Sequence, residues 1–209
     1  MKRKIFVLGD SISIEYGPYL RECLGKQFDY DRKRGEEALI DLNQPVGANG
    51  GDSNCVLEYL REQTEMKIHY DILLLNCGLH DIRTNIDTKE KQVPQEVYRN
   101  NLENIMELCS CSTKKTIWIS TTPVDDAQHA KYEKTFRRYN EDIKQYNKIA
   151  ENIMGQYKIP IIDLYGYTIG LGNQLYYDHV HYREEIRALQ GAFIAENIRL
   201  LLQSEYIVL

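Results

Sequence analysis

The sequence predicts an α/β fold of three layers, in which helices cover both faces of a flavodoxin-like, five-stranded parallel sheet. Two observations support this class. Short apolar runs alternate with longer amphipathic segments along the chain, which is the pattern of a sheet built from repeated strand and helix units. The runs that begin at Asp71, Thr116 and Ile159 are apolar at nearly every position, as expected of strands buried on both faces.

The expected strands follow from these apolar runs. They comprise residues 4–8, a weaker run between 38 and 46, and residues 71–76, 116–120 and 159–163. The second strand is the least defined of the five, because the residues from Tyr30 to Glu37 are mostly charged and charged residues are uncommon in strands. A loop is therefore an equally good interpretation of that stretch.

The expected helices occupy the amphipathic segments between the strands, where apolar residues recur at helical spacing. They cover residues 16–24, 53–64, 95–109 and about 132–156, and a last helix at 184–203 closes the fold. No internal repeat, low-complexity segment or linker interrupts this order. Residues 1–209 are therefore expected to form a single domain.

Composition excludes several classes of protein. With 26 basic and 31 acidic residues, a net charge of -5 and no sustained basic block, the chain is not expected to bind nucleic acid. The apolar run after the basic start is too short for a signal peptide or a membrane span, so a cytoplasmic location without membrane attachment is expected. The five cysteines form no zinc-ligand pattern and are expected to be reduced thiols.

Polar residues gather directly after the predicted strands, which is where an open parallel sheet binds its ligands. They are Gly9-Asp10-Ser11, the turn-rich residues 47–53, residues 76–81, residues 121–126, and Asp178-His179-Val180-His181 before the last helix. The topology thus brings a serine, a glycine-rich turn, a His-Asp pair and an Asp-x-x-His pair to one edge of the sheet.

This combination fits nucleophilic acyl transfer. A serine hydroxyl is a weak nucleophile unless an imidazole takes its proton and a carboxylate orients that imidazole. Asp178 and His181 are three positions apart, so the carboxylate can reach one ring nitrogen while the other nitrogen faces Ser11. The backbone N–H groups of Ser11 and of the Gly50-Gly51 turn are the expected donors to the oxyanion.

The polar blocks resemble those of the GDSL, or SGNH, hydrolases. Gly9-Asp10-Ser11-Ile12 is similar to the first block of that family, Gly50-Gly51-Asp52-Ser53 to the second, and Asp178-x-x-His181 to the last. The resemblance extends over nearly the whole chain and implies an SGNH-hydrolase fold. It also implies that Ser11 is the nucleophile, that Gly51 donates to the oxyanion, and that Asp178 and His181 are the acid and the base.

The third block departs from the family pattern. Where the family commonly has Gly-x-Asn-Asp, this chain has Gly78-Leu79-His80-Asp81. A ring N–H of His80 can replace the asparagine amide as oxyanion donor, although it depends on tautomer and protonation. If His80 must be protonated while His181 must be neutral, activity follows a narrow bell-shaped pH profile.

Several of the candidate residues also have structural interpretations. Ser11 alone would fit a helix N-cap, and Asp10 is expected to accept hydrogen bonds from the backbone of its own loop. His69 and His129 are expected on the surface, with His129 and Asp125 near the entrance to the site. His179 is expected to be solvated.

The expected reaction is hydrolysis of a small-molecule ester, with a short acyl group on a polar or carbohydrate carrier and without metal or cofactor. Tyrosines cluster between Tyr165 and Tyr182, where they can stack on a sugar ring. Two alternatives stay open. Asp178, His179 and His181, together with His80 and Asp81, carry enough ligand atoms for a hydrolytic metal centre. The strand pattern also suits a flavodoxin-like module that binds a small ligand without catalysis.

The apolar end of the chain leaves the oligomeric state open. Tyr206-Ile207-Val208-Leu209 follows a charged helix. An exposed apolar segment of this kind packs on the core or on another subunit. A homo-oligomer is therefore one of the two outcomes that this segment allows.

Overall fold

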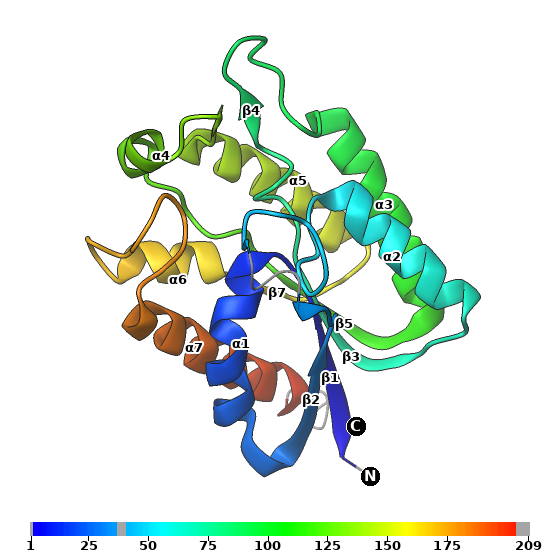
Figure 1. Cartoon of the computed structure of the whole chain (residues 1–209). Coiled ribbons are helices and arrows are strands. Elements are labelled where there is room, and N and C mark those ends of the chain that lie inside the picture. The colour runs from blue at the N-terminus through cyan, green and yellow to red at the C-terminus, as the bar shows by residue number, and fades with distance from the viewer. Residues whose placement is uncertain (1, 37–40, 204–209) are drawn as a thin grey trace.

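The computed structural model describes residues 2–36 and 41–203, and within them it has the predicted α/β architecture (Figure 1). Five parallel strands form the main sheet in the order β2-β1-β3-β5-β7. Their bounds are β1 Arg3–Leu8, β2 Phe28–Arg32, β3 Tyr70–Leu75, β5 Thr113–Ile119 and β7 Ile161–Ile162. Two short strands, β4 (Thr84–Asn85) and β6 (Phe136–Arg137), pair antiparallel beside it.

Helices cover both faces of the main sheet, which gives the three layers that the sequence predicts (Figure 1). Helix α1 packs against α7, with α6 beside α7, while α2, α3 and α5 pack together on the other side. Their bounds are α1 Ser11–Leu24, α2 Ser53–Glu65, α3 Gln95–Ser112, α4 Asp126–Tyr132, α5 Asn140–Gln156, α6 Leu164–Gly170 and α7 Glu184–Gln203, with a short 3-10 helix at Gly25–Gln27.

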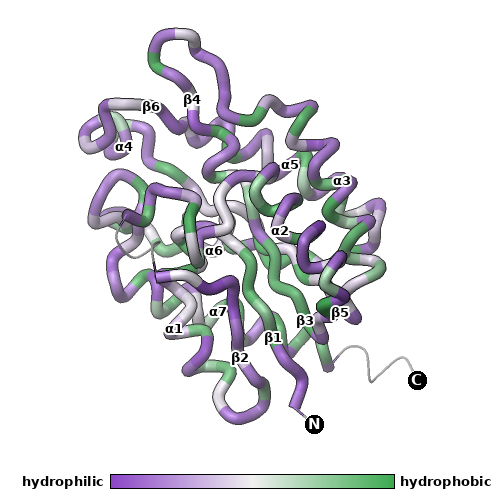
Figure 2. The backbone as a smooth tube through the Cα atoms, turned by 45° about the vertical axis from the view of Figure 1, so that its right-hand side comes forward, coloured by the Kyte–Doolittle hydropathy of each residue, from purple (hydrophilic) through white to green (hydrophobic). Residues whose placement is uncertain are grey.

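The core lies on both sides of the central strands, because their side chains are apolar in both directions. Figure 2 shows hydrophobic residues concentrated along β1 and β3. These strands pair in register from Ile5 with Ile72 to Leu8 with Leu75, and all four of these side chains are buried. The two strands therefore fix the position of the loops that leave their carboxyl ends.

The second strand differs from the expectation. It is β2, Phe28–Arg32, at the edge of the sheet, whereas residues 41–46 of the expected stretch form turns and residues 38–40 lie outside the described residues. An edge strand has one neighbour and one open side, so it tolerates charged residues. Asp29 and Asp31 are such residues, and they made this strand hard to recognise.

The long helix expected from residue 132 also differs, because it begins at Asn140 and follows the separate helix α4. Between them the chain is extended, and Phe136 pairs with β4. Phe136 lies under two arginine side chains of the site, a contact that a continuous helix would not place there.

The last strand is shorter than expected, and the tail at 206–209 lies outside the described residues.

Helix α1 begins earlier than expected, at Ser11 rather than at residue 16. Its N-cap is Asp10, whose carboxylate accepts the Ile12 N–H at 3.0 Å, as expected for this loop. The second polar loop approaches closely, since the Gly50 N–H donates to the Gly9 carbonyl at 2.9 Å. A Cβ at Gly50 would lie 3.0 Å from that carbonyl oxygen, so a larger residue would crowd the place where the two loops meet.

Two further expectations concern the cysteines and the membrane. All five cysteines are free thiols, as predicted. Over residues 2–36 and 41–203, none of the helices has the length and apolar character needed to span a bilayer.

Candidate active site

Ser11 and His181 meet at the carboxyl end of the sheet. The His181 Nε2 lies 3.0 Å from the Ser11 Oγ, although 170 positions separate the two residues. Ser11 is the first residue of α1, directly beyond β1, and His181 stands shortly before α7. Only 2% of Ser11 and 1% of His181 is exposed, so their hydrogen bond lies away from bulk water.

Asp178 completes the arrangement from the other side of the imidazole. Its Oδ2 lies 2.7 Å from the His181 Nδ1, and its Oδ1 accepts the N–H groups of Val180 and His181 at 2.8 and 2.7 Å. Burial opposes ionisation of this carboxyl, but the hydrogen bonds from the imidazole and the backbone outweigh it and lower the pKa of Asp178 to about 2. An ionised carboxylate keeps the proton on Nδ1 and leaves the Nε2 lone pair facing Ser11.

The expected oxyanion donors differ in their availability. The Ser11 N–H has no acceptor among the described residues. The Gly51 N–H donates to the Asn49 Oδ1 at 2.9 Å, so donation to an oxyanion would require sharing this bond or moving the Asn49 side chain. Gly51 has φ +73°, and a Cβ there would lie 2.7 Å from the Pro45 Cβ. Both the turn and the space therefore require a glycine.

His80 is buried beside this centre with a free ring nitrogen. Only 1% of it is exposed, and its Nδ1 has no hydrogen-bond partner among the described residues. Burial, followed by the nearby charges of Arg138, Arg83 and His181, holds the pKa of His80 well below its usual range. The surroundings thus favour a neutral imidazole, which carries one N–H donor, over the cationic form.

Asp81, the neighbour of His80, ties the third block to the second. Both of its carboxylate oxygens accept the Ser53 N–H, at 2.9 and 3.1 Å. Ser53 begins α2 directly after Asp52, so this bond fixes the turn that contains Gly51. Complete burial raises the pKa of Asp81 to about 7. Asp81 is therefore a positioning residue, and not a base in contact with Ser11.

Arg138 belongs to the same centre and was not predicted from the sequence. It is 1% exposed, its Nε donates to the Leu79 carbonyl at 2.8 Å, and its Nη1 has no partner among the described residues. Burial and the charge of Arg83 lower its pKa to about 9. The Phe136 ring lies near both guanidinium groups, at 4.7 Å from Arg83 and 4.9 Å from Arg138. Arg138 was missed because it falls in a segment that was expected to be helical.

His129 and His179 are buried, so the expectation of surface positions was wrong for both. His129 is 0% and His179 is 6% exposed, and their Nδ1 atoms lie 3.1 Å apart. The His179 Nε2 lies 3.0 Å from the Asn43 Oδ1, which can only accept, so His179 donates from Nε2 and His129 donates from Nδ1. Burial lowers the pKa of each to about 4. The contact between α4 and the loop before α7 encloses them, whereas His69 is exposed as expected.

A metal centre would have to use atoms that already have partners. Among the described residues, Asp178, His179 and His181 bring potential ligand atoms within 4.8 Å of one another. His181 uses its nitrogens for Asp178 and Ser11, and His179 uses its nitrogens for His129 and Asn43. A metal ion would have to break several of these bonds. The arrangement instead matches the hydrogen bonding of a serine, a histidine and an aspartate in acyl transfer.

Comparison with known proteins agrees with this chemistry. The family model described as GDSL-like Lipase/Acylhydrolase matches residues 5–192. No curated protein matches the chain. Among solved structures, a lipase/acylhydrolase from Enterococcus faecalis has a TM-score of 0.70 and 20% identity, covering 94% of this chain and 95% of its own.

Two further solved structures have the same fold. Est24, a carbohydrate acetylesterase from Sinorhizobium meliloti, has a TM-score of 0.62 at 16% identity and covers 96% of this chain and 100% of its own. The acetyl xylan esterase AlAXEase has a TM-score of 0.69 at 13% identity and covers 93% of this chain and 99% of its own. At these identities the likeness establishes the fold.

Proposed function

The chain belongs to the family of GDSL-like lipases and acylhydrolases and is a carboxylic ester hydrolase, and on this premise we propose that Ser11, His181 and Asp178 are its catalytic triad. The observation that carries the proposal is the unbroken line of hydrogen bonds, 3.0 Å from the Ser11 Oγ to the imidazole and 2.7 Å from the imidazole to Asp178. Serine hydrolases on unrelated folds use this same relation of hydroxyl, imidazole and carboxylate.

The proposed reaction proceeds in two steps through an acyl-enzyme. The Ser11 Oγ attacks the ester carbonyl carbon while its proton passes to the His181 Nε2. Asp178 stabilises the imidazolium through Nδ1. As the tetrahedral intermediate collapses, His181 gives the proton to the departing alcohol oxygen and the acyl group stays on Ser11. Water then attacks the acyl-enzyme with His181 as base, which releases the acid and restores the serine.

The negative charge on the carbonyl oxygen is proposed to be stabilised by the Ser11 N–H and by a neutral His80. Two features support this assignment: neither group has a hydrogen-bond acceptor among the described residues, and both are buried, where such donors have their greatest effect. Gly51 is the third proposed donor, and it acts once the oxyanion competes with the Asn49 Oδ1 for its N–H.

The test is replacement of the nucleophile. Ser11→Ala is expected to lower kcat on p-nitrophenyl acetate by at least about 10³, because the remaining residues have no nucleophile to activate. The unsubstituted protein should also react covalently with a fluorophosphonate probe, and Ser11→Ala should not. Ser110→Ala, which changes an exposed serine of α3, is the matched control and should behave as the unsubstituted protein.

The same experiment separates the alternatives. Activity that survives Ser11→Ala but is lost on chelation would identify a metal-dependent hydrolase instead. A folded protein that neither turns over the ester nor reacts with the probe would favour a binding module. Hydrolysis that survives chelation and depends on Ser11 supports the triad.

The proposed substrate is an ester with a short acyl group on a polar or carbohydrate carrier. Its support is the set of tyrosines around the last block, of which Tyr176 and Tyr177 lie directly before Asp178. The fold also occurs in proteins described as a carbohydrate acetylesterase and an acetyl xylan esterase. Faster turnover of p-nitrophenyl acetate than of a long-chain nitrophenyl ester is expected, and the reverse order would overturn the short-chain assignment.

A further inference from the structure

Glu15 is a buried carboxylate that lies one helical turn beyond Ser11 in α1. The two residues are four positions apart, so their side chains leave the same face of the helix. Only 8% of Glu15 is exposed, and its Oε2 has no hydrogen-bond partner among the described residues. An ionised group that is buried with an unsatisfied oxygen costs stability. Stability alone therefore does not account for a carboxylate at this position.

The Glu15 Oε1 has two partners, and both come from the part of the chain that surrounds His181. The Tyr177 hydroxyl donates to it at 3.1 Å from the loop before α7, and the Arg187 Nη2 lies 2.9 Å away in the first turn of α7. The Arg187 guanidinium also lies 4.8 Å from the centre of the Tyr177 ring, within the range of a cation–π contact. These three residues, called the Glu15 cluster below, join α1, the loop and α7.

Both partners of Glu15 also contact the chain at the proposed base. The Tyr177 N–H donates to the His181 carbonyl at 3.0 Å, and the two rings lie alongside each other with centroids 6.0 Å apart and planes at 28°. The Arg187 Nε donates to the carbonyl of Tyr182, the residue after His181. The Glu15 cluster thus connects the backbone around His181 to the helix that begins with Ser11.

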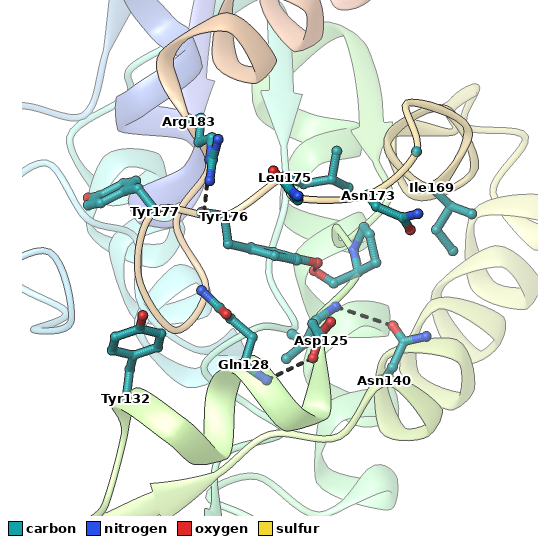
Figure 3. A pocket seen from close by; sticks show the side chains of 14 residues that line it. Asp125, Gln128, Tyr132, Asn140, Ile169, Asn173, Leu175, Tyr176, Tyr177 and Arg183 are labelled. Carbon is teal, nitrogen blue, oxygen red and sulfur yellow. Dashed lines mark hydrogen bonds between the residues drawn. The ribbon is translucent and has the colours of Figure 1, made fainter.

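Figure 3 shows a cavity and, beside it, the loop that carries Tyr177. Tyr176 and Tyr177 point in opposite directions from this loop (Figure 3). The Tyr176 hydroxyl donates to the Pro123 carbonyl at 2.9 Å, and the Tyr176 carbonyl accepts from the Arg183 Nε at 3.3 Å. The loop is therefore held from two sides, and Glu15 provides an attachment to α1.

The charge of Glu15 also interacts with His181. Burial raises the pKa of Glu15, whereas the charge of His181, followed by that of Arg187, lowers it. Attraction between two charges is mutual, so an ionised Glu15 favours the imidazolium that forms when His181 takes the Ser11 proton. The other titratable and charged groups that face Glu15 or His181 from the surrounding elements are Asp10, His80, Tyr177, Asp178 and His179.

On these contacts, and on the proposed function, we propose that Glu15 is a positioning residue of the hydrolase. It holds the backbone around His181 against α1 through Tyr177 and Arg187, and its charge stabilises the protonated imidazole during the reaction. Asp178 remains the carboxylate that is hydrogen-bonded to the imidazole, with its Oδ2 2.7 Å from Nδ1. Glu15 acts on the base through its two partners and through its charge.

The first test removes the charge of Glu15 and keeps its shape. Glu15→Gln retains an oxygen that can accept from Tyr177, but the imidazole should lose its proton at lower pH. The acidic limb of kcat/KM for p-nitrophenyl acetate is expected to move down by about half a pH unit or more, and the plateau to fall at least about threefold. Glu15→Asp keeps the charge and should leave the limb in place. Glu22→Gln, at an exposed glutamate of the same helix, is the matched control and should change neither.

The position of the acidic limb separates this role from a structural one. A limb that stays in place in Glu15→Gln would overturn the proposal however far the rate falls, and so would an equal movement in Glu15→Asp. NMR titration of the His181 ring should give a lower midpoint in Ser11→Ala/Glu15→Gln than in Ser11→Ala, and this measurement does not depend on turnover. Failure of the triad would appear separately, as p-nitrophenyl acetate hydrolysis that survives Ser11→Ala.

The second test breaks the attachment between α1 and the loop, and it applies even where Glu15→Gln fails to fold. Tyr177→Phe keeps the ring and removes the hydroxyl that donates to Glu15. Its kcat is expected to fall about threefold with KM unchanged, because the base is placed less precisely. Tyr157→Phe, at an exposed tyrosine elsewhere, is the matched control. An unchanged kcat in Tyr177→Phe would overturn the role of Glu15 in holding this loop.

Discussion

In the proposed mechanism His80 donates a hydrogen bond to the oxyanion, and its surroundings determine which protonation form it takes. It is buried among cationic groups, with Arg138 and Arg83 both lowering its pKa after the larger effect of burial. A histidine whose pKa is well below 6.5 carries no charge at neutral pH. The neutral ring has one N–H, so it can replace an amide donor one for one.

The first prediction follows from this equivalence. His80→Asn retains a side-chain N–H and is expected to keep kcat within about tenfold of the unsubstituted enzyme, whereas His80→Ala should lose about 10²–10³ because one oxyanion donor is removed. Since the lowered pKa of His80 keeps its ring neutral at pH 7 and above, the pH profiles of the unsubstituted enzyme and of His80→Asn should have the same shape between pH 7 and 9. Initial rates on p-nitrophenyl acetate measure both effects.

A difference between the two pH profiles would contradict this prediction. If a cationic His80 were the donor, the unsubstituted enzyme would lose activity as the pH rises through its pKa, and His80→Asn would not. His69→Asn, at an exposed histidine, controls for the loss of an imidazole elsewhere on the protein.

The sequence allowed prediction that Ser11, His181 and Asp178 lie together, but not which groups surround them. Asp178 and His181 are neighbours in the chain, so their spacing alone indicates a hydrogen bond. Arg138 and Asn43 act on residues far away in the sequence, Leu79 and His179 respectively, and no local pattern marks such contacts. His129 and His179 were assigned to the surface because histidine is often exposed, although packing of α4 on the loop before α7 buries both.

At the scale of the elements, one buried carboxylate joins the loop after β3 to the start of α2. Asp81 accepts the Ser53 N–H with both oxygens, and the Asn101 amide donates to the Ser53 Oγ at 2.9 Å from α3. The turn at Gly51 is therefore held from two neighbouring elements. The ionised form of Asp81 is penalised by its complete burial, which raises its pKa to about 7.

The second prediction concerns the pH dependence of stability that this raised pKa causes. The folded state binds the Asp81 proton more tightly than the unfolded state does, so protonation of Asp81 adds to the free energy of unfolding. This added stability is fully present below the ordinary pKa of about 4 and is lost as the pH rises through about 7. Asp81→Asn cannot ionise. Its urea midpoint is therefore expected to fall less than that of the unsubstituted protein between pH 5 and 8.

The matched control is Asp29→Asn, at an exposed aspartate of β2. Its urea midpoint should depend on pH in the same way as that of the unsubstituted protein. If the urea midpoints of Asp81→Asn and of the unsubstituted protein changed equally with pH, the prediction would be wrong. The Ser53 hydrogen bonds would then keep the Asp81 carboxylate ionised in the folded state.

Helices and strands were predictable from the sequence where their apolar residues recur at regular spacing on a buried face. Helices α2, α3 and α7 begin at the predicted residues 53, 95 and 184, because their apolar residues recur along one face. Strand β2 lies at an edge, where charged residues are tolerated, and was therefore misplaced. The start of α5 was missed because residues 133–139 contribute to the site, where Phe136 packs on arginines instead of continuing a helix.

At the scale of the whole molecule, the active site depends on two helices from opposite ends of the chain. Helix α1 begins with Ser11, and α7 follows His181. The two helices pack along each other on one face of the sheet (Figure 1), and Gly191 of α7 lies against residues 19 and 20 of α1. A Cβ added at Gly191 would lie 2.7 Å from the Leu20 backbone nitrogen and 2.8 Å from the Tyr19 Cβ. The glycine thus allows the two helices to pack closely, and we expect this contact to influence the distance between Ser11 and His181.

The third prediction tests this dependence with a matched pair of glycine-to-alanine changes. In an open helix position such a change stabilises by about 0.5–1 kcal/mol, and Gly155→Ala in α5, where a Cβ would meet nothing within 4 Å, is expected to do so without affecting kcat. Gly191→Ala must push α7 away from the α1 backbone, so it is expected to destabilise the protein by about 1–3 kcal/mol. It is also expected to lower kcat about tenfold, because reacting groups tolerate little displacement.

Urea unfolding and initial rates on p-nitrophenyl acetate measure both effects. A Gly191→Ala protein as stable and active as Gly155→Ala would show that the α1–α7 contact does not control the distance from Ser11 to His181.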